Sequence, residues 1–447
     1  MAEQLPGGDR ADAQDGGEGS TEPIEDPSRV LVAPLKLIDP EVADLIEAEL
    51  ERQRTTLDLV ASENVPPRAV LEAQGSILTA KYADGYPGAR QYDTCEVIDA
   101  IESLAIERAK ALFCADHANV QPYSGSSANQ SVLRALCQPG DVVLGFDFNQ
   151  GGHPTHYSPD TFAGRYYTTF SYGVRRSDRL VDMEQVASLA RLHMPKVIFA
   201  GWSCYPRFLD FRAFREICDE VGAYLVVDMA HFAGLVAAGL HPDPVTYADA
   251  CTMTVHKTLG GARGGTILCS AELAERVDAA VFPGEQGCPL PHVIAAKAVT
   301  FAVAGTDAYR ERMERTVAGA AAMAAALAAD PARVGAEVVT GGTDVHQLLV
   351  DLGPSGREAG AEMARLNSLR ISANCIPLAY DSQQAPLVSG IRIGSAALAS
   401  RGFGTAEFVE VGSILADALA TSGSHDGALA GRVRSLTDAF PIYPHLG

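Results

Sequence analysis

A lysine that lies between an imidazole and a glycine-rich turn is the residue with the clearest chemical potential. Lys257 directly follows His256, and residues 260–265 read Gly-Gly-Ala-Arg-Gly-Gly. Residues 252–255 are rich in β-branched side chains, as on a strand that ends at a site. A lysine amine in such a place can condense with a carbonyl such as that of pyridoxal phosphate (PLP). A surface lysine beside a loop is the alternative for this stretch alone.

An acid at the end of an apolar run favours the chemical interpretation. Residues 223–227 read Ala-Tyr-Leu-Val-Val and lead to Asp228, 29 positions before Lys257. Such a run is typical of a buried strand of a parallel sheet, whose carboxyl end faces the crevice where open α/β sheets bind ligands. PLP chemistry needs a carboxylate there to keep the pyridine nitrogen protonated. An Asp that caps a turn is the alternative, but Asp228, His231 and Lys257 together are more specific than any one of them.

Composition excludes several classes of protein. The chain has 447 residues, of which 47% are hydrophobic, enough for a large core and two domains. A net charge of −21 argues against a nucleic acid or an anionic membrane surface as partner. The nine cysteines form no CxxC pair, so the sequence predicts neither a metal site nor a disulfide framework. Without a signal peptide or a long apolar run, we expect a soluble cytoplasmic protein.

Changes in composition divide the chain into four parts. Residues 1–29 contain eight acids and two arginines and read as a disordered acidic tail. Residues 30–65 form an N-terminal arm with a helix near its middle. Residues 66–304 alternate helical and strand patterns, which predicts a doubly wound, mostly parallel sheet that carries the PLP site. Residues 305–447 read as a smaller C-terminal α/β domain.

Three segments have residue types that suit a cofactor. Ser124-Gly125-Ser126 is a predicted strand-to-helix turn, where backbone N–H groups can bind phosphate, although an ordinary N-cap is the commoner role. His153 follows two glycines and could stack on a cofactor ring, whereas a lone histidine is more often structural. Ser203 follows a predicted strand at 197–201 and could hydrogen-bond a phenolic oxygen.

Two further groups suit a substrate. Arg392 lies in a short apolar strand, where an unpaired charge is costly and the carboxylate of an amino acid could pair with it. An internal salt bridge is nearly as good an explanation. Tyr82, Asp84 and Tyr92 lie in a Gly/Pro/Tyr-rich loop, a composition that suits an active-site lid or a subunit contact.

These and other motifs resemble, in order from about residue 30 to 445, those of serine hydroxymethyltransferase. The segments that carry the resemblance are 59–64 (LVASEN), 81–88 (KYADGYPG), 124–126 (SGS), 151–153 (GGH), 227–231 (VDMAH), 254–258 (TVHKT), 282–287 (FPGEQG), 389–394 (SGIRIG) and 402–404 (GFG).

The resemblance implies PLP fold type I, a homodimer with shared active sites, and small-molecule amino-acid substrates; the sequence leaves open whether two dimers pair into a tetramer. It implies that Lys257 carries the cofactor, that Asp228 pairs with the pyridine nitrogen and that His153 stacks on the ring. The other implied cofactor contacts are Ser203 and His231 near the phenolic oxygen, Gly125, Ser126 and the partner chain's Gly287 at the phosphate, and Tyr82 from the neighbouring subunit. The implied substrate and proton-transfer residues are Arg392, Ser62, Tyr92, Asp84, His256 and Thr254.

The sequence also departs from the family pattern on the side of the site that faces folate. The family has Glu where this chain has Asp84, which withdraws the carboxylate by about 1.5 Å, and a shift of about 1 Å can cost a hundredfold in rate. The other departures are Gln91 for an aromatic Tyr, Pro154 for Leu, Ser372-Ala373-Asn374 for Asn-Lys-Asn, and Cys288 for Gly.

From these departures we predict a PLP-dependent aldol and retro-aldol enzyme that has turned away from tetrahydrofolate. It would be an L-threonine:aldehyde transaldolase of specialised metabolism, such as antibiotic biosynthesis, that passes a glycyl unit to a second aldehyde. The first alternative is a folate-dependent serine hydroxymethyltransferase that tolerates the substitutions. The second, from another class, is a non-catalytic binding protein on the same fold.

Overall fold

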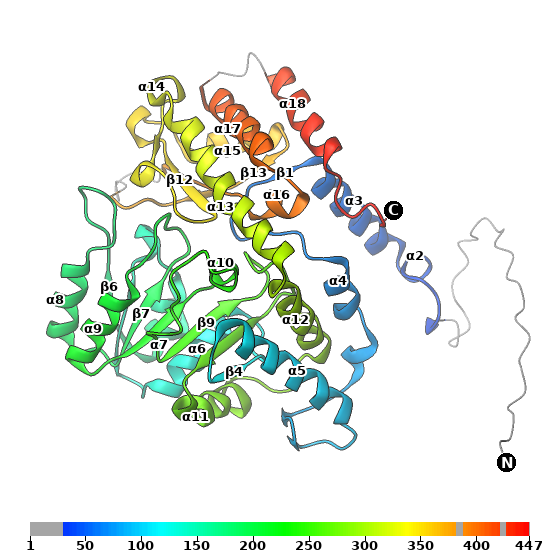
Figure 1. Ribbon diagram of the computed structural model, residues 1–447, viewed down its shortest axis with the longest axis vertical. Coiled ribbons are helices and arrows are strands. Elements are labelled where there is room, and N and C mark those ends of the chain that lie inside the picture. The colour runs from blue at the N-terminus through cyan, green and yellow to red at the C-terminus, as the bar shows by residue number, and fades with distance from the viewer. Residues whose placement is uncertain (1–29, 381–387, 421–425, 447) are drawn as a thin grey trace, which may run out of the picture. The chain divides into compact units, whose positions relative to one another are not determined.

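The computed structural model describes residues 30–380, 388–420 and 426–446 (Figure 1). The predicted acidic tail at 1–29 lies outside the described residues. The chain falls into two units, of which the first ends at Arg52 and the second covers residues 53–446. Helix α2 (Leu35–Ile38) lies in the first unit, and α3 (Pro40–Thr55) begins there. The backbone N–H of Val42 donates to Asp39 Oδ1 at 3.0 Å, so an aspartate caps the predicted helix.

Seven strands of the second unit form one sheet, in the order β4-β10-β9-β8-β7-β5-β6. β10 is antiparallel to both of its neighbours, whereas the pairs among β9, β8, β7, β5 and β6 are parallel. The predicted mostly parallel seven-stranded sheet is therefore confirmed. The strands are β4 (His117–Asn119), β5 (Val142–Phe146), β6 (Thr168–Tyr172), β7 (Val197–Gly201), β8 (Tyr224–Asp228), β9 (Ala250–Thr254) and β10 (Gly265–Cys269).

Both faces of this sheet are buried, as the continuous apolar runs predict. Along β7, Val197 and Phe199 belong to one hydrophobic core, and the alternate residues Ile198 and Ala200 belong to another. The first core is completed by α6 (Gly125–Leu136), α7 (Phe162–Tyr166) and α11 (Ala274–Ala279). The second is completed by α5 (Glu96–Phe113), α8 (Met183–His193), α9 (Phe211–Val221), α10 (Ala233–Ala237) and α12 (Pro291–Ala304).

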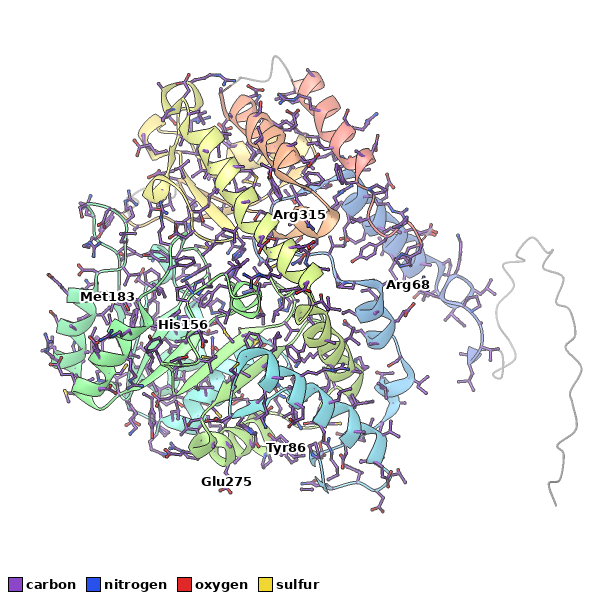
Figure 2. All side chains as sticks on the ribbon, viewed as in Figure 1. Arg68, Tyr86, His156, Met183, Glu275 and Arg315 are labelled. Atoms are coloured by element: carbon purple, nitrogen blue, oxygen red, sulfur yellow. The ribbon has the colours of Figure 1, made fainter. Side chains whose placement is uncertain are left out.

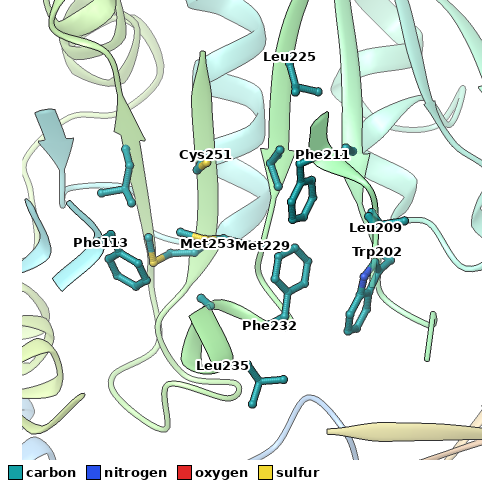
Figure 3. Packing of buried hydrophobic residues seen from close by; sticks show 14 of the residues in the cluster. Phe113, Trp202, Leu209, Phe211, Leu225, Met229, Phe232, Leu235, Cys251 and Met253 are labelled. Atoms are coloured by element: carbon teal, nitrogen blue, oxygen red, sulfur yellow. The ribbon is translucent and has the colours of Figure 1, made fainter. Parts of the chain in front are cut away.

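Large aromatic side chains fill the second of these cores (Figure 3). The rings of Trp202 and Phe232 lie 5.1 Å apart, and Phe211 lies 6.1 Å from Phe232. Trp202 directly follows β7 and Phe232 lies between β8 and α10, so this packing joins the two segments that leave the carboxyl ends of these strands.

The C-terminal part has a smaller antiparallel sheet in the order β11-β12-β15-β14 and its own core. Helix α13 (Asp307–Ala328) links this core to the one that contains Trp202. Tyr309 and Met313 pack in the Trp202 core, and Met323 and Leu327 pack in the core of the C-terminal part. The separate cores favour the predicted division near residue 305, which stays a prediction. The strands are β11 (Glu337–Val338), β12 (Gln347–Asp351), β14 (Asn374–Ile376) and β15 (Gly390–Gly394), and the helices are α14 (Pro331–Val334), α15 (Ala359–Ser368), α16 (Ala396–Arg401), α17 (Thr405–Ala420) and α18 (Asp426–Ala439).

Four short strands and one short helix complete the frame of the site. β1 (Leu57–Asp58) pairs with β13 (Ile371–Ser372), and the hairpin of β2 (Gly85–Tyr86) and β3 (Ala89–Arg90) follows α4 (Arg68–Gln74). Among the described residues, no helix combines the length and the apolar character needed to cross a membrane.

Candidate active site

Asp228 ends β8 and is 5% exposed. Its Oδ2 accepts hydrogen bonds from Asn129 Nδ2 at 2.8 Å and His156 Nε2 at 3.0 Å, and its Oδ1 accepts one from the backbone N–H of Ala230 at 2.9 Å. Figure 2 labels His156 among the side chains of the molecule. Burial alone would raise the pKa of Asp228, but the hydrogen bond and charge of His156, with the contact from Asn129, hold that pKa well below its usual range. The carboxylate stays ionised and keeps one acceptor position for a further donor.

Lys257 follows β9, and neighbouring residues hold its backbone in place. Its carbonyl accepts a hydrogen bond from Asn64 Nδ2 at 2.8 Å, and the hydroxyl of Thr258 donates to the carbonyl of His231 at 2.9 Å. Burial lowers the pKa of Lys257 to about 8, although the negative charge of Asp228 acts in the opposite direction. A sizeable fraction of the amine is therefore neutral near physiological pH, as condensation with a carbonyl requires.

The turn before α6 is where the sequence predicts a phosphate site, which stays a prediction. Ser124 caps the helix by accepting the N–H of Ser127 at 3.0 Å, which leaves the N–H groups of Gly125 and Ser126 in the first turn, where a helix has no internal acceptors. A Cβ on Gly125 would lie 2.7 Å from Cγ2 of Thr254, so only glycine fits this close approach.

Three neutral imidazoles and a serine surround this centre. Burial lowers the pKa of His153 to about 4 and of His256 to about 3, and it lowers the pKa of His231 as well. His153 Nδ1 lies 2.6 Å from the hydroxyl of Thr155, which fixes the orientation of its ring. Ser203 is 8% exposed, and its N–H donates to the carbonyl of Gly151 at 2.9 Å, so the loops after β5 and β7 are joined.

Arg392 lies on β15 of the C-terminal sheet and reaches the loop after β7. Its Nη1 donates to the carbonyl of Ser203 at 2.9 Å, and its Nη2 donates to Asn374 Oδ1 at 2.8 Å. The guanidinium is 8% exposed, and its Nε has no hydrogen-bond partner within the described part of the chain. The alternative of an internal salt bridge is not realised there, because both recorded oxygen partners are neutral. A carboxylate ligand would satisfy the free donor.

The loop with Asp84 is held by a buried arginine. Arg90 Nη1 donates to the carbonyls of Ala83 and Gly85, at 2.9 and 2.6 Å, on either side of Asp84. Asp84 Oδ1 is buried and has no hydrogen-bond partner among the described residues. It is therefore available to a ligand.

Other predicted site residues are more exposed to solvent. The rings of Tyr82 and Tyr92 are 56% and 46% exposed and stand edge to face, 5.1 Å apart. Ser126 and Gly287 are also exposed, and Ser62 is half-buried. These residues are not enclosed by this chain alone.

The arrangement fits PLP. The spare acceptor of Asp228 suits a protonated pyridine nitrogen, the first turn of α6 suits a phosphate, and the Lys257 amine has the lowered pKa that its role needs.

The ring and carboxylate atoms of His153, His156 and Asp228 lie within 4.8 Å of one another, a spacing that could also hold a metal. Two of the acceptor positions of Asp228 are, however, already used by Asn129 and His156.

Comparisons with known proteins agree with this geometry. A family model described as serine hydroxymethyltransferase matches residues 35–415. The chain belongs to this family. A serine hydroxymethyltransferase of Nocardia farcinica is 55% identical over 92% of this chain and 95% of the relative, and one of Kineococcus radiotolerans is 53% identical over 94% and 97%. Serine hydroxymethyltransferase 1 of Mycobacterium tuberculosis is 53% identical over 93% and 96%. As a family member, the chain has PLP fold type I and is a PLP-dependent transferase that acts on amino acids.

The prediction of a threonine transaldolase with an aldehyde acceptor and a role in antibiotic biosynthesis was wrong. Relatives that match more than nine tenths of the chain are named serine hydroxymethyltransferase. The prediction gave too much weight to single substitutions in the wall of the site. Asp84 is still a carboxylate on a loop fixed by Arg90, and Asn374 still contacts Arg392. These contacts show that the family site can keep its frame despite the changes.

Sequence reasoning missed several residues of the site. Asn129 and His156 hold Asp228, and Asn64 holds Lys257. The position of Asn129, one helical turn after Gly125, was a possible signal, because residues three or four apart share a helix face. Nothing in the local sequence around His156 indicates that it approaches Asp228, since 72 residues separate the two.

Proposed function

We propose that the chain interconverts L-serine and glycine, with tetrahydrofolate as the acceptor of the one-carbon unit. The names of the relatives support this reaction, and the buried set of Lys257, Asp228 and Arg392 suits its amino-acid half. The observation that supports the folate half is the buried oxygen of Asp84, which has no hydrogen-bond partner among the described residues.

Bound PLP would withdraw electrons from the α-carbon of the amino acid. Lys257 would hold the cofactor through its amine, and the ionised Asp228 would keep a proton on the pyridine nitrogen. His153 would lie against the ring, and Ser203 and His231 would lie beside its phenolic oxygen. Gly125 and Ser126 would bind the phosphate through backbone N–H groups.

The substrate would be held at its carboxylate by Arg392, with Ser62 beside it. Asp84 would exchange a proton with the hydroxyl group of serine, and Tyr92 would line the same side of the site. Thr254 ends β9 and His256 directly precedes Lys257, and both would tune proton transfer at its amine. Because burial lowers the pKa of His256 to about 3, its imidazole acts as a neutral group.

We also propose a homodimer with shared active sites. The paired rings of Tyr82 and Tyr92 expose about half of their surface, and the space around Gly287 is open, since a Cβ there would meet no atom within 4 Å. A second copy of the chain would cover the rings and bring its own Gly287 to the phosphate. Exposed tyrosine rings are typical of such contacts.

The variant Asp84→Asn tests the assignment, because it separates the two halves of the reaction. Formation of methylene-tetrahydrofolate from L-serine should fall by about 10²–10⁴-fold, the usual contribution of a general acid–base group. Exchange of the α-proton of glycine in D₂O, followed by NMR, should be retained, since it needs only the PLP side. Folate-dependent turnover by the variant at the wild-type rate would contradict the role of Asp84. Absence of that turnover in the wild-type enzyme would contradict the reaction itself.

A further inference from the structure

Lys297 on α12 is a fully buried ammonium that the proposed reaction does not use. It is 1% exposed. Its Nζ donates to the carbonyl oxygens of Val120 at 2.6 Å, Pro122 at 3.0 Å and Gly265 at 2.7 Å. Three donated hydrogen bonds require the protonated form, because a neutral amine has only two N–H groups.

The three carbonyl groups lie in the two backbone segments that pack next to the proposed phosphate site. Val120 and Pro122 lie between β4 and the Ser124 cap of α6, and Gly265 begins β10. The N–H of Gly265 donates to the carbonyl of Pro122 at 2.9 Å. A Cβ on Gly265 would stand 2.2 Å from the carbonyl oxygen of Ser124, so the two segments are in direct contact. Lys297 therefore joins the turn that precedes the phosphate site to the glycine-rich segment that follows Lys257.

The backbone of this turn is fixed at each residue. Between the two carbonyls held by Lys297, the carbonyl of Gln121 accepts from Gln286 Nε2 at 3.1 Å. The oxygen of the same Gln286 side chain accepts the N–H of Tyr123 at 2.9 Å. With its carbonyls engaged on the inner side, the turn is fixed in the orientation that starts α6 at Gly125.

The charge of Lys297 is costly to bury, and no carboxylate accepts a hydrogen bond from it among the described residues. Burial lowers the pKa of Lys297 to about 7, whereas Glu102 and the three carbonyl oxygens around Nζ favour the charged form. The oxygens of Glu102 accept hydrogen bonds from Arg90 Nη2 at 2.6 Å and Gln121 Nε2 at 2.7 Å. A side chain that served only to fill space here could be apolar and would avoid this cost.

We propose that Lys297 is a positioning residue for the cofactor phosphate. It fixes the turn so that the N–H groups of Gly125 and Ser126 face the phosphate, and it places a positive charge behind the phosphate dianion. The inference depends on the proposed phosphate site at Gly125 and Ser126. It goes beyond the proposed reaction, because it concerns how strongly the chain prefers a phosphorylated cofactor.

The test compares PLP with pyridoxal, which lacks the phosphate. Full-length wild-type protein and the variants Lys297→Met and Lys297→Gln are freed of cofactor by dialysis and titrated with each compound. Quenching of the fluorescence of Trp202, the only tryptophan, reports binding. Lys110→Met, on the surface of α5, is the matched control. Ser126→Asp puts a negative charge into the phosphate site at a helix N-terminus, where an acid does not harm folding.

We expect Lys297→Met and Lys297→Gln to weaken PLP binding by about tenfold or more and pyridoxal binding by less than about twofold. The two compounds should differ because only PLP carries a phosphate group that the positive charge of Lys297 can attract. The glutamine variant covers the case in which methionine prevents folding. Equal losses for both compounds would mean that Lys297 only stabilises the fold, and would overturn the inference. If Ser126→Asp also leaves the ratio of PLP affinity to pyridoxal affinity unchanged, the proposed phosphate site itself is wrong. If Ser126→Asp lowers this ratio and the Lys297 variants do not, only the inference about Lys297 fails.

Discussion

Nε2 of His156 lies 3.0 Å from Oδ2 of Asp228, and both side chains are buried. The histidine comes from the short turn after β5, and the aspartate ends β8, so the contact joins two strands of the sheet at its ligand-binding edge. Together with Asn129, this contact keeps a carboxylate ionised where burial alone would favour its neutral form.

Replacing His156 by Asn should therefore raise the pKa of Asp228 and weaken its hold on the pyridine proton. We expect kcat to fall by about tenfold, the cost of roughly one hydrogen bond to a charged group. The pH dependence of the visible cofactor absorbance measures the change directly, and its acidic transition should move to higher pH. His445→Asn, at an exposed position, is the control and should behave as the wild type. An unchanged titration in His156→Asn would refute the role of this contact.

The lowered pKa of Lys257 predicts how cofactor capture depends on pH. Only the neutral amine can attack the carbonyl, and the neutral fraction rises as the pH passes through the pKa of about 8. The rate at which cofactor-free protein takes up PLP should therefore increase with pH to a midpoint near 8. Stopped-flow absorbance between pH 6 and about 10 checks this, the upper limit being the usual pKa of lysine. A midpoint near that ordinary value would mean that Lys257 is more solvated than the structure shows.

The Arg90–Glu102 pair predicts a coupled effect on stability. Their side chains are 3% and 1% exposed, with Nη2 and Oε2 2.6 Å apart. Arg90→Met leaves a buried carboxylate without its cation, so the free energy of unfolding should fall by about 3–5 kcal/mol. Adding Glu102→Gln removes that charge and should restore part of the loss. Urea denaturation of the two single variants and the double variant measures the coupling.

Arg212→Met, in an exposed pair with Glu216 on α9, is the control for this cycle and should change stability by less than about 1 kcal/mol. Additive effects of Arg90→Met and Glu102→Gln would argue against a direct interaction. Arg90→Met should also slow folate-dependent turnover, since Arg90 holds the carbonyls that flank Asp84.

The order of apolar and polar residues along short segments is enough to predict several helices and strands of the fold. The run that ends at Asp228 is buried on both faces and forms β8, and the segment 405–420 forms α17 as its apolar periodicity indicates. The alanine-rich run from Thr316 to Ala329 predicts a long helix over those residues, whereas α13 begins at Asp307, where the side chain of Thr306 accepts the N–H of Tyr309 at 3.2 Å. A threonine cap ten residues before Thr316 is a weak signal beside a run of alanines.

Contacts between distant segments were beyond the sequence patterns. Lys297 looks like an ordinary helix residue, and only the folded chain brings it to the carbonyls of Val120 and Gly265. The same limit explains the error about the reaction. The prediction of a transaldolase relied on residues near Asp84 that differ from the family pattern. The sequence patterns did not indicate that Arg90 binds the backbone on either side of Asp84.

The most direct test of the proposed reaction follows a labelled carbon. Wild-type enzyme is supplied with PLP, tetrahydrofolate and L-serine that carries ¹³C at its β-carbon, and the products are followed by NMR. The account predicts that the label appears in the methylene bridge of methylene-tetrahydrofolate while unlabelled glycine forms in equal amount. If the label stays in serine, or leaves it without reaching the folate, the chain does not catalyse hydroxymethyl transfer and the proposed function is wrong.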